Sequence, residues 1–133
     1  MIISEYDHIR LSGIIDKLRY SPRADRRALN WLEARITAAT ILPPEFLPET
    51  AVTMYSRVRF TNLTTGEELV YTLVFPAEAS IEKNKVSVLS PIGMSLLGSL
   101  CGDVVEFPTP DGTARLRVEE VLYQPEAAGY LYV

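Results

Sequence analysis

The spacing of apolar residues indicates two helices in the first third of the chain. From Ser4 to Tyr20 the apolar residues fall on one helical face, and Asp7, three residues after Ser4, suggests a capped helix start. After the break at Ser21-Pro22 a second set recurs near every 3.5 residues. The two sets are Tyr6, Ile9, Ile14, Ile15 and Leu18, then Ala28, Leu29, Leu32, Ile36 and Ala39. Residues 4–40 are therefore predicted to form an antiparallel helical hairpin, a short coiled coil.

A proline-rich segment then separates two kinds of periodicity. The stretch ILPPEFLPET has three prolines and cannot continue a helix. It divides the chain into a hairpin over residues 1–41, a linker over 42–50 and a second domain over 51–133. In that domain Met54, Ser56, Val58 and Phe60 alternate with polar residues, which predicts a half-buried strand. After the turn NLTTGEE, residues 69–75 are apolar on both faces, as expected of an interior strand.

The stretch VSVLSPIGMSLLGSLCGDVVEF combines a short strand, a short helix and the start of another strand. Ser90 is placed as the helix N-cap, Pro91 as the first helical residue, and Gly98 or Gly102 as the helix end. Expected core residues are Val86, Val88, Leu96, Leu97 and Val104. In the last strand Leu116, Val118 and Leu122 form the expected inner face, with Glu120 near a bulge. The fold class is α+β, with about five strands and one short helix after the hairpin.

Composition narrows the class of protein. With 133 residues, 47% hydrophobic and 23% charged, the chain can bury one compact core. It begins with no signal-like segment, so a cytoplasmic protein is expected. Cys101 and His8 are each the only residue of their kind and stand far apart, so no disulfide, metal site, cofactor or catalytic pair is expected. The net charge of −4 comes entirely from the part after residue 47.

The order of motifs in the second domain is similar to a known family. Residues 58–112, VRFTNLTTGEELVYTLVFPAEASIEKNKVSVLSPIGMSLLGSLCGDVVEFPTPDG, resemble the C-terminal domain of the bacterial transcript-cleavage factors GreA and GreB. The short hairpin, the entry TMYSRVRF and the tail VLYQPEAAG resemble the Rnk branch of that superfamily, the regulators of nucleoside diphosphate kinase. The resemblance implies an FKBP-like curved antiparallel sheet wrapped on one short helix.

The same resemblance implies RNA polymerase as the partner. Family members dock this domain at the rim of the polymerase secondary channel, and the hairpin enters the channel. The docking region corresponds to Leu89, Ser90, Pro91, Ile92 and Met94, of which Ser90, Pro91 and Met94 are expected to be exposed. This chain has Leu89 where the cleavage factors commonly have Asp or Asn, and Ser99 where they have Lys. A monomer without membrane association is expected, and indirect contact with nucleic acid in the transcription complex stays open.

The expected hairpin tip differs from that of a cleavage factor. Cleavage factors carry acidic residues there that help to hold a catalytic magnesium ion. This tip has one acid among four arginines: Arg19, Arg23, Asp25, Arg26 and Arg27. One carboxylate among four positively charged side chains is not expected to bind a metal cation. We therefore expect a regulator that is not an enzyme, with the arginines serving either as a solvated helix end or as a contact to phosphates or an acidic surface.

Two alternative functions follow from the same sequence. An FKBP-like sheet can act as a peptidyl-prolyl isomerase if aromatic residues line a pocket, although the aromatics here are scattered along the chain. The other alternative is a general protein-interaction adaptor whose partner is a different protein. Trp31 is either an exposed interface anchor or, as we expect, the residue that packs the hairpin against the second domain.

Overall fold

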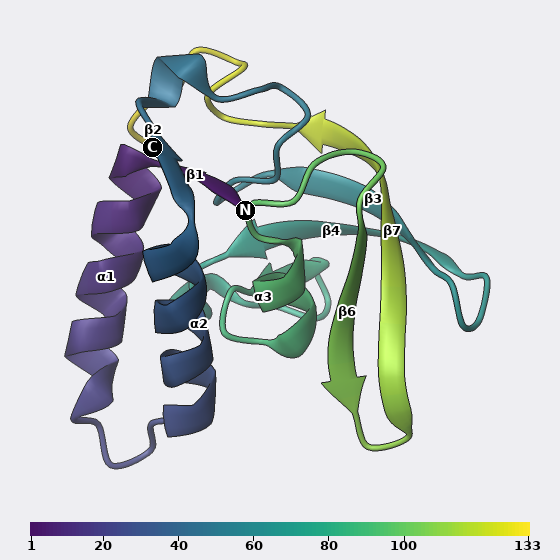
Figure 1. Cartoon of the computed structure of the whole chain (residues 1–133), viewed down its shortest axis with the longest axis horizontal. Helices are drawn as coiled ribbons and strands as arrows, with labels where there is room; N and C mark the ends of the chain where they lie inside the picture. The colour runs from purple at the N-terminus through teal and green to yellow at the C-terminus, as the bar shows by residue number, and fades with distance from the viewer.

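The computed structural model describes all 133 residues and begins with the expected helical hairpin. Helix α1 (Glu5–Arg19) and helix α2 (Arg26–Ala38) run side by side and are joined by a short turn (Figure 1). Ser4 caps α1, its Oγ accepting a hydrogen bond from the Asp7 amide, as predicted. Helix α2 begins later than Pro22 suggests, because Asp25 is its N-cap and accepts from the Ala28 amide.

The hairpin is tied at its base by a small parallel sheet that periodicity does not predict. Strand β1 (Ile2–Ser4) pairs with β2 (Thr40–Leu42), so the chain enters α1 and leaves α2 through neighbouring strands. The proline-rich connection that follows contains a 3₁₀ turn, η1 (Pro44–Phe46). A second 3₁₀ turn, η2 (Pro76–Glu78), follows strand β4. None of the helices is long and apolar enough to span a membrane.

A curled sheet of five strands forms the rest of the molecule, in the order β5-β4-β3-β7-β6. Strand β3 (Arg57–Asn62) lies between β4 (Glu68–Val74) and β7 (Gly112–Tyr123), and β6 (Val104–Thr109) is an edge strand. Neighbouring strands are antiparallel except at the other edge, where β5 (Lys85–Ser87) runs parallel to β4. Helix α3 (Pro91–Leu96) lies between the sheet and the hairpin (Figure 1).

One hydrophobic cluster connects the hairpin with the sheet. Leu11 and Ile15 of α1 and Leu32 of α2 belong to the same buried cluster as Phe60 of β3 and Leu97 after α3. Burying this apolar area is the main stabilising term for the arrangement of the two parts. The predicted core residues Val88, Leu96, Leu97, Leu116 and Val118 are buried, and Val86 is partly buried against them.

Three predicted inward positions are wrong. In α1, Ile9 is 68% exposed and Leu11 is fully buried in its place. In β6, Val104 is 44% exposed, because it pairs with the outward Arg117 while Val105 packs against the cluster. In β7, Leu122 is 42% exposed.

The error at Leu122 comes from the bulge that was expected near Glu120. Arg59 pairs with Glu120 whereas the next residue, Phe60, pairs with Val118, so Glu119 is an extra residue in β7. This insertion shifts the alternation by one position, and Val121 rather than Leu122 packs inward.

Candidate functional site

The Ser90-Pro91 motif forms a rigid helix start at the surface. The Gly93 amide donates to Ser90 Oγ at 3.1 Å, and the Ser90 hydroxyl donates to the carbonyl oxygen of Ser87 at 2.6 Å. A Cβ atom on Gly93 would lie 2.0 Å from that same carbonyl oxygen, so only glycine fits. Gly98, with φ +75°, follows the end of α3. The predicted N-cap, first helical residue and glycine helix end are therefore confirmed.

Burial of α3 leaves few of its residues available to a partner. Every residue from Gly93 to Ser99 is buried, whereas Pro91 is exposed and Leu89, Ser90 and Ile92 are partly exposed. The expected exposure of Met94 is wrong, since its side chain is only 1% exposed and lies in the core cluster. Ser99 also faces the interior, where its hydroxyl donates to the carbonyl oxygen of Leu96. Pro91 is thus the outermost residue of this motif.

Pro91 separates two surface hollows. The first, of about 330 Å³, lies between α3 and strands β4 and β5 and is lined almost wholly by apolar atoms. Its lining includes Tyr71, Val86, Ile92 and Phe107 together with Pro91. Ile81, in the loop before β5, also lines it and is 95% exposed. A large aliphatic side chain so exposed beside an apolar hollow is typical of a contact site.

The second hollow, of about 560 Å³, lies on the other side of Pro91, between α2 and the turn joining β6 to β7. Its apolar lining includes Trp31, Leu89, Met94, Pro108 and Pro110, and its charged residues are Asp25 and Arg27. Trp31 is partly buried against the core cluster and lines this hollow with Leu89 and Met94 of the second domain, in line with the expectation that it packs between the two parts.

The hairpin tip carries the charge pattern expected from the sequence. Arg23, Arg26 and Arg27 are exposed, and none of them forms an ion pair. Arg19 pairs with Glu33 of α2. The carboxylate of Asp25 is used as the N-cap of α2. No cluster of potential metal ligands occurs in the molecule.

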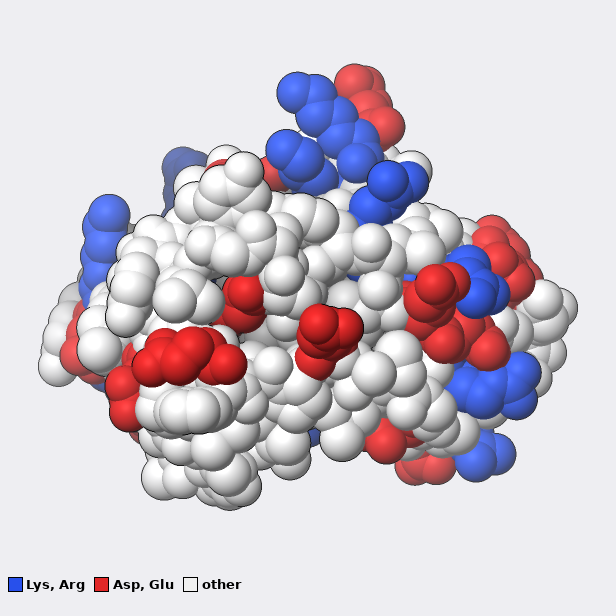
Figure 2. Space-filling view, turned by 90° about the horizontal axis from the view of Figure 1, so that it is seen from above, with Lys and Arg blue, Asp and Glu red and all other residues white.

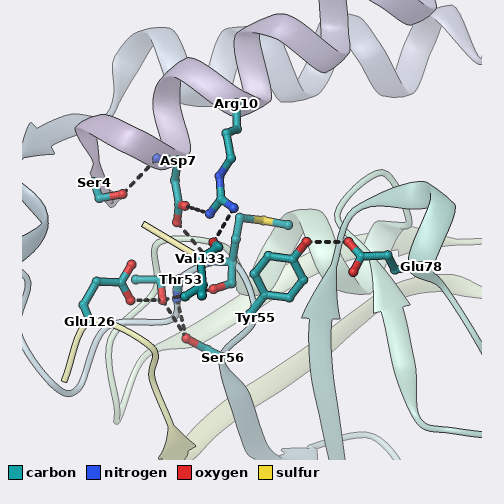
Figure 3. Close-up of polar contacts among 10 residues, drawn as sticks. Ser4, Asp7, Arg10, Thr53, Tyr55, Ser56, Glu78, Glu126 and Val133 are labelled. Atoms are coloured by element: carbon teal, nitrogen blue, oxygen red, sulfur yellow. Dashed lines mark hydrogen bonds and ion pairs between the residues drawn. The ribbon is translucent and has the colours of Figure 1, made fainter. Parts of the chain in front are cut away.

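A buried polar network joins the start of α1 to the segment before β3 and to the C-terminal segment (Figure 3). Asp7 accepts hydrogen bonds from the Met54 amide, at 3.0 Å, and from the Arg10 guanidinium. Arg10 also lies over the ring of Tyr6, 4.2 Å from its centroid, and donates to the carbonyl oxygen of Val133. The network therefore holds α1, the segment before β3 and the C-terminal segment together.

The segment before β3 is a tight turn rather than the start of a strand. The Thr53 amide donates to Ser56 Oγ at 2.8 Å, and Thr53 Oγ1 donates to Glu126 at 2.7 Å. Tyr55 has φ +66°, a left-handed conformation that is rare for a tyrosine. Met54 and Ser56 are buried as predicted, but the strand itself begins at Arg57. Polar side chains here satisfy buried backbone groups, which is a structural role.

Burial changes the acidity of this network. Loss of hydration raises the pKa of Asp7, and its bonds to Arg10 and the Met54 amide only partly oppose that rise. Burial likewise raises the pKa of Glu126. Burial, together with the hydrogen bond from the Tyr55 hydroxyl to Glu78, raises the pKa of Tyr55 to about 12. All three groups are hydrogen-bonded to neighbours in the fold: Asp7 to Arg10 and the Met54 amide, Glu126 to Thr53, and Tyr55 to Glu78.

Comparison with known proteins assigns the family. The profile described as "Transcription elongation factor, GreA/GreB, C-term" matches residues 47–123, more than half of the chain. The chain belongs to the GreA/GreB family. The "Regulator of nucleoside diphosphate kinase" of Escherichia coli (strain K12) is 40% identical over 130 residues, which cover 97% of this chain and 93% of that protein. The "Transcription elongation factor GreA" of Helicobacter hepaticus is 34% identical over 92% of this chain and 79% of its own.

Solved structures agree with the GreA/GreB assignment. The "Prokaryotic transcription elongation factor GreA/GreB from Nitrosomonas europaea" superposes with a TM-score of 0.73 at 37% identity. The superposition covers 92% of this chain and 98% of that one. The comparisons therefore confirm the resemblance to GreA/GreB and Rnk proteins. They also confirm the α+β fold, a helical hairpin followed by a curled sheet.

Sequence reasoning missed two exposed side chains that the structure places at hollows. Ile81 stands alone in the polar stretch AEASIEKNK, and that isolation was the available signal for a contact residue. Tyr20, 85% exposed at the hairpin tip, lines a third hollow with Arg19 and Arg26, and the sequence offers no signal for it beyond its place at the end of the helical apolar series.

Proposed function

We propose that this protein is an RNA polymerase-binding transcription regulator of the Rnk type that supplies no transcript-cleavage chemistry. The observation that carries the proposal is the exposed Pro91, held by a rigid helix start between two hollows, in a domain of the GreA/GreB family. The protein would act as a cytoplasmic monomer, and its C-terminal domain, residues 51–133, would dock near the secondary channel.

The surface around Pro91 suits a protein partner. It combines an apolar hollow, the exposed Ile81 and a backbone held by the Ser90 cap, so little conformational entropy is lost on binding. Leu89, Ser90 and Ile92 complete the predicted contact, and Met94 supports it from within the core. Interfaces of this kind gain most of their binding energy from a few buried apolar anchors, a role that Pro91 and Ile81 can fill.

The hairpin tip supports a non-catalytic role. A magnesium ion takes oxygen ligands, usually one or two carboxylates besides water, and the single carboxylate between residues 19 and 27 already caps α2. Three unpaired arginines at the same place would repel a cation. A protein that occupies the channel mouth with such a tip would compete with cleavage factors without replacing them.

Binding of the fluorescently labelled protein to purified bacterial RNA polymerase tests the docking surface. Ile81→Ser should weaken binding about fivefold or more, since truncating an interface anchor costs more than about 1 kcal/mol. Ile9→Ser is the matched control, because Ile9 is 68% exposed on α1, away from both hollows. Equal affinities of the two variants, or no binding of the wild type at micromolar protein, would refute the proposed surface.

The first hollow also favours a second candidate function, peptidyl-prolyl isomerisation. The fold brings Tyr71 and Phe107, far apart in the sequence, into one apolar hollow of about 330 Å³, the kind of pocket that can desolvate a proline. Cis-trans exchange of a proline peptide, measured with and without the protein, tests this function. A rate equal to the uncatalysed one would dismiss it.

A further inference from the structure

The hairpin tip carries positive charge that the rest of the fold does not neutralise. Most other arginines are engaged, since five of them form ion pairs: Arg10, Arg19, Arg59, Arg115 and Arg117. By contrast Arg23, Arg26 and Arg27 are exposed and unpaired within five residues of one another. Asp25, the N-cap of α2, is the one carboxylate among them, and the first turn of α2 itself holds no acidic residue.

The end of the molecule away from the hairpin tip exposes several carboxylates. Figure 2 shows the end of the molecule that bears η1 and the C-terminal segment. Acidic side chains lie across the middle of this face, and basic side chains lie mainly at its edges. Glu45 and Glu49, in and just after η1, are exposed. The unpaired arginines at the tip, and the carboxylates exposed at this end, favour approach of a polyanion to the tip.

A recess beside these arginines contains an exposed aromatic ring. The recess, of about 310 Å³, lies between the end of α1 and the first turns of α2. It is lined by Arg19, Tyr20, Arg26, Leu29 and Asn30. Tyr20 is 85% exposed, so its ring gains almost nothing from packing in the free protein. The Asn30 side chain is also exposed and makes no hydrogen bond within the chain.

We propose that the hairpin tip binds single-stranded nucleic acid, with one base stacked on Tyr20 and the flanking phosphates held by Arg23, Arg26 and Arg27. Cations interleaved with an exposed aromatic ring are the combination by which proteins hold single strands. An acidic peptide without aromatic residues would use the charges but has no flat ring to stack on Tyr20. A duplex would hide its base faces from that ring. This inference concerns the free protein and does not rest on polymerase docking.

The stacking contact gives the first test. Anisotropy of a labelled single-stranded RNA should show binding by the wild type at low salt. Tyr20→Ala should weaken it roughly 5- to 150-fold, the equivalent of the ~1–3 kcal/mol that a stacked base contributes. Tyr20→Trp should retain or improve binding, which a purely electrostatic site would not require. Because Tyr20 is so exposed, these variants should fold normally.

The salt dependence gives the second test. Arg26→Ala should reduce the slope of log affinity against log salt by about 0.7, the value for one lost phosphate contact on a single strand. Arg115→Ala is the matched control, because Arg115 is exposed in β7 but paired with Glu106, and it should leave the slope unchanged.

Several outcomes would overturn the proposal. These are no salt-sensitive binding by the wild type, equal affinity of wild type and Tyr20→Ala, and binding of a polyglutamate peptide or a duplex as tight as that of the single strand.

Discussion

Replacing Asp7 with alanine should weaken the attachment of the hairpin to the sheet and lower the free energy of unfolding. The substitution removes the acceptor of the Met54 amide, 47 positions away, and the partner of Arg10. A buried amide left without an acceptor costs about 1–3 kcal/mol. Breaking a fully buried ion pair costs about 3–5 kcal/mol, but Arg10 is 20% exposed and can recover part of its hydration. The raised pKa of Asp7 shows that burying its charge already carries a cost. We therefore expect a net loss of about 2–4 kcal/mol.

Urea unfolding followed by the fluorescence of Trp31, the only tryptophan, measures this loss. Asp7→Asn should lose less, because an amide oxygen can still accept from the Met54 amide and no charge is buried. Asp16→Ala is the control, since Asp16 is exposed on the same helix without an ion pair, and it should change stability by less than about 0.5 kcal/mol. A loss below about 1 kcal/mol for Asp7→Ala, or equal losses for the alanine and asparagine variants, would refute the assigned role of the network.

Three further predictions concern the motif at Pro91 and the network. Gly93→Ala should destabilise the protein by more than about 2 kcal/mol in urea unfolding, because its Cβ would lie 2.0 Å from a carbonyl oxygen; Gly13→Ala, in open space within α1, should instead stabilise it by about 0.5–1 kcal/mol. Leu89→Asp introduces the acidic residue common in cleavage factors and should tighten binding of the labelled protein to RNA polymerase, whereas unchanged binding would count against docking at this position. Glu126→Gln should be more stable than the wild type at pH 7, and by a smaller margin at pH 4. Folding raises the pKa of Glu126 above its ordinary value of 4.5, so the wild type is stabilised when this carboxyl is protonated and loses that contribution as pH rises. A stability difference independent of pH would contradict the burial effect.

The parts of the fold that local chemistry determines could be predicted from the sequence. Ser4 and Ser90 cap helices because a hydroxyl next to an apolar helical series satisfies free amides, whatever the tertiary structure. The alternation at Val58 and Phe60 likewise marked the inward face of β3, because successive strand side chains point to opposite faces. The bulge at Glu119 could be suspected but its effect on Leu122 could not, since it depends on how β7 pairs with β3.

The rest depended on contacts between distant segments. A charged residue such as Asp7 is ordinarily exposed, and its burial follows from the Met54 amide that only the folded chain presents to it. Periodicity placed Ile9 rather than Leu11 inward, because the buried stripe of α1 is set by where α2 and the sheet lie. The hollow that joins Tyr71 with Phe107 likewise has no local signature. The docking residues around Pro91 came from family resemblance, and they stay a prediction.

Transcript cleavage in backtracked RNA polymerase complexes tests the central claim most directly. GreA from the same bacterium as the polymerase is added to the complexes at a fixed concentration. This protein is then added in increasing amounts, and the shortened RNA is measured. The account predicts that this protein produces no cleavage by itself and lowers GreA-stimulated cleavage with increasing dose. The Ile81→Ser variant should require more protein for the same effect. Cleavage by this protein alone, or undiminished GreA activity at saturating protein, would contradict it.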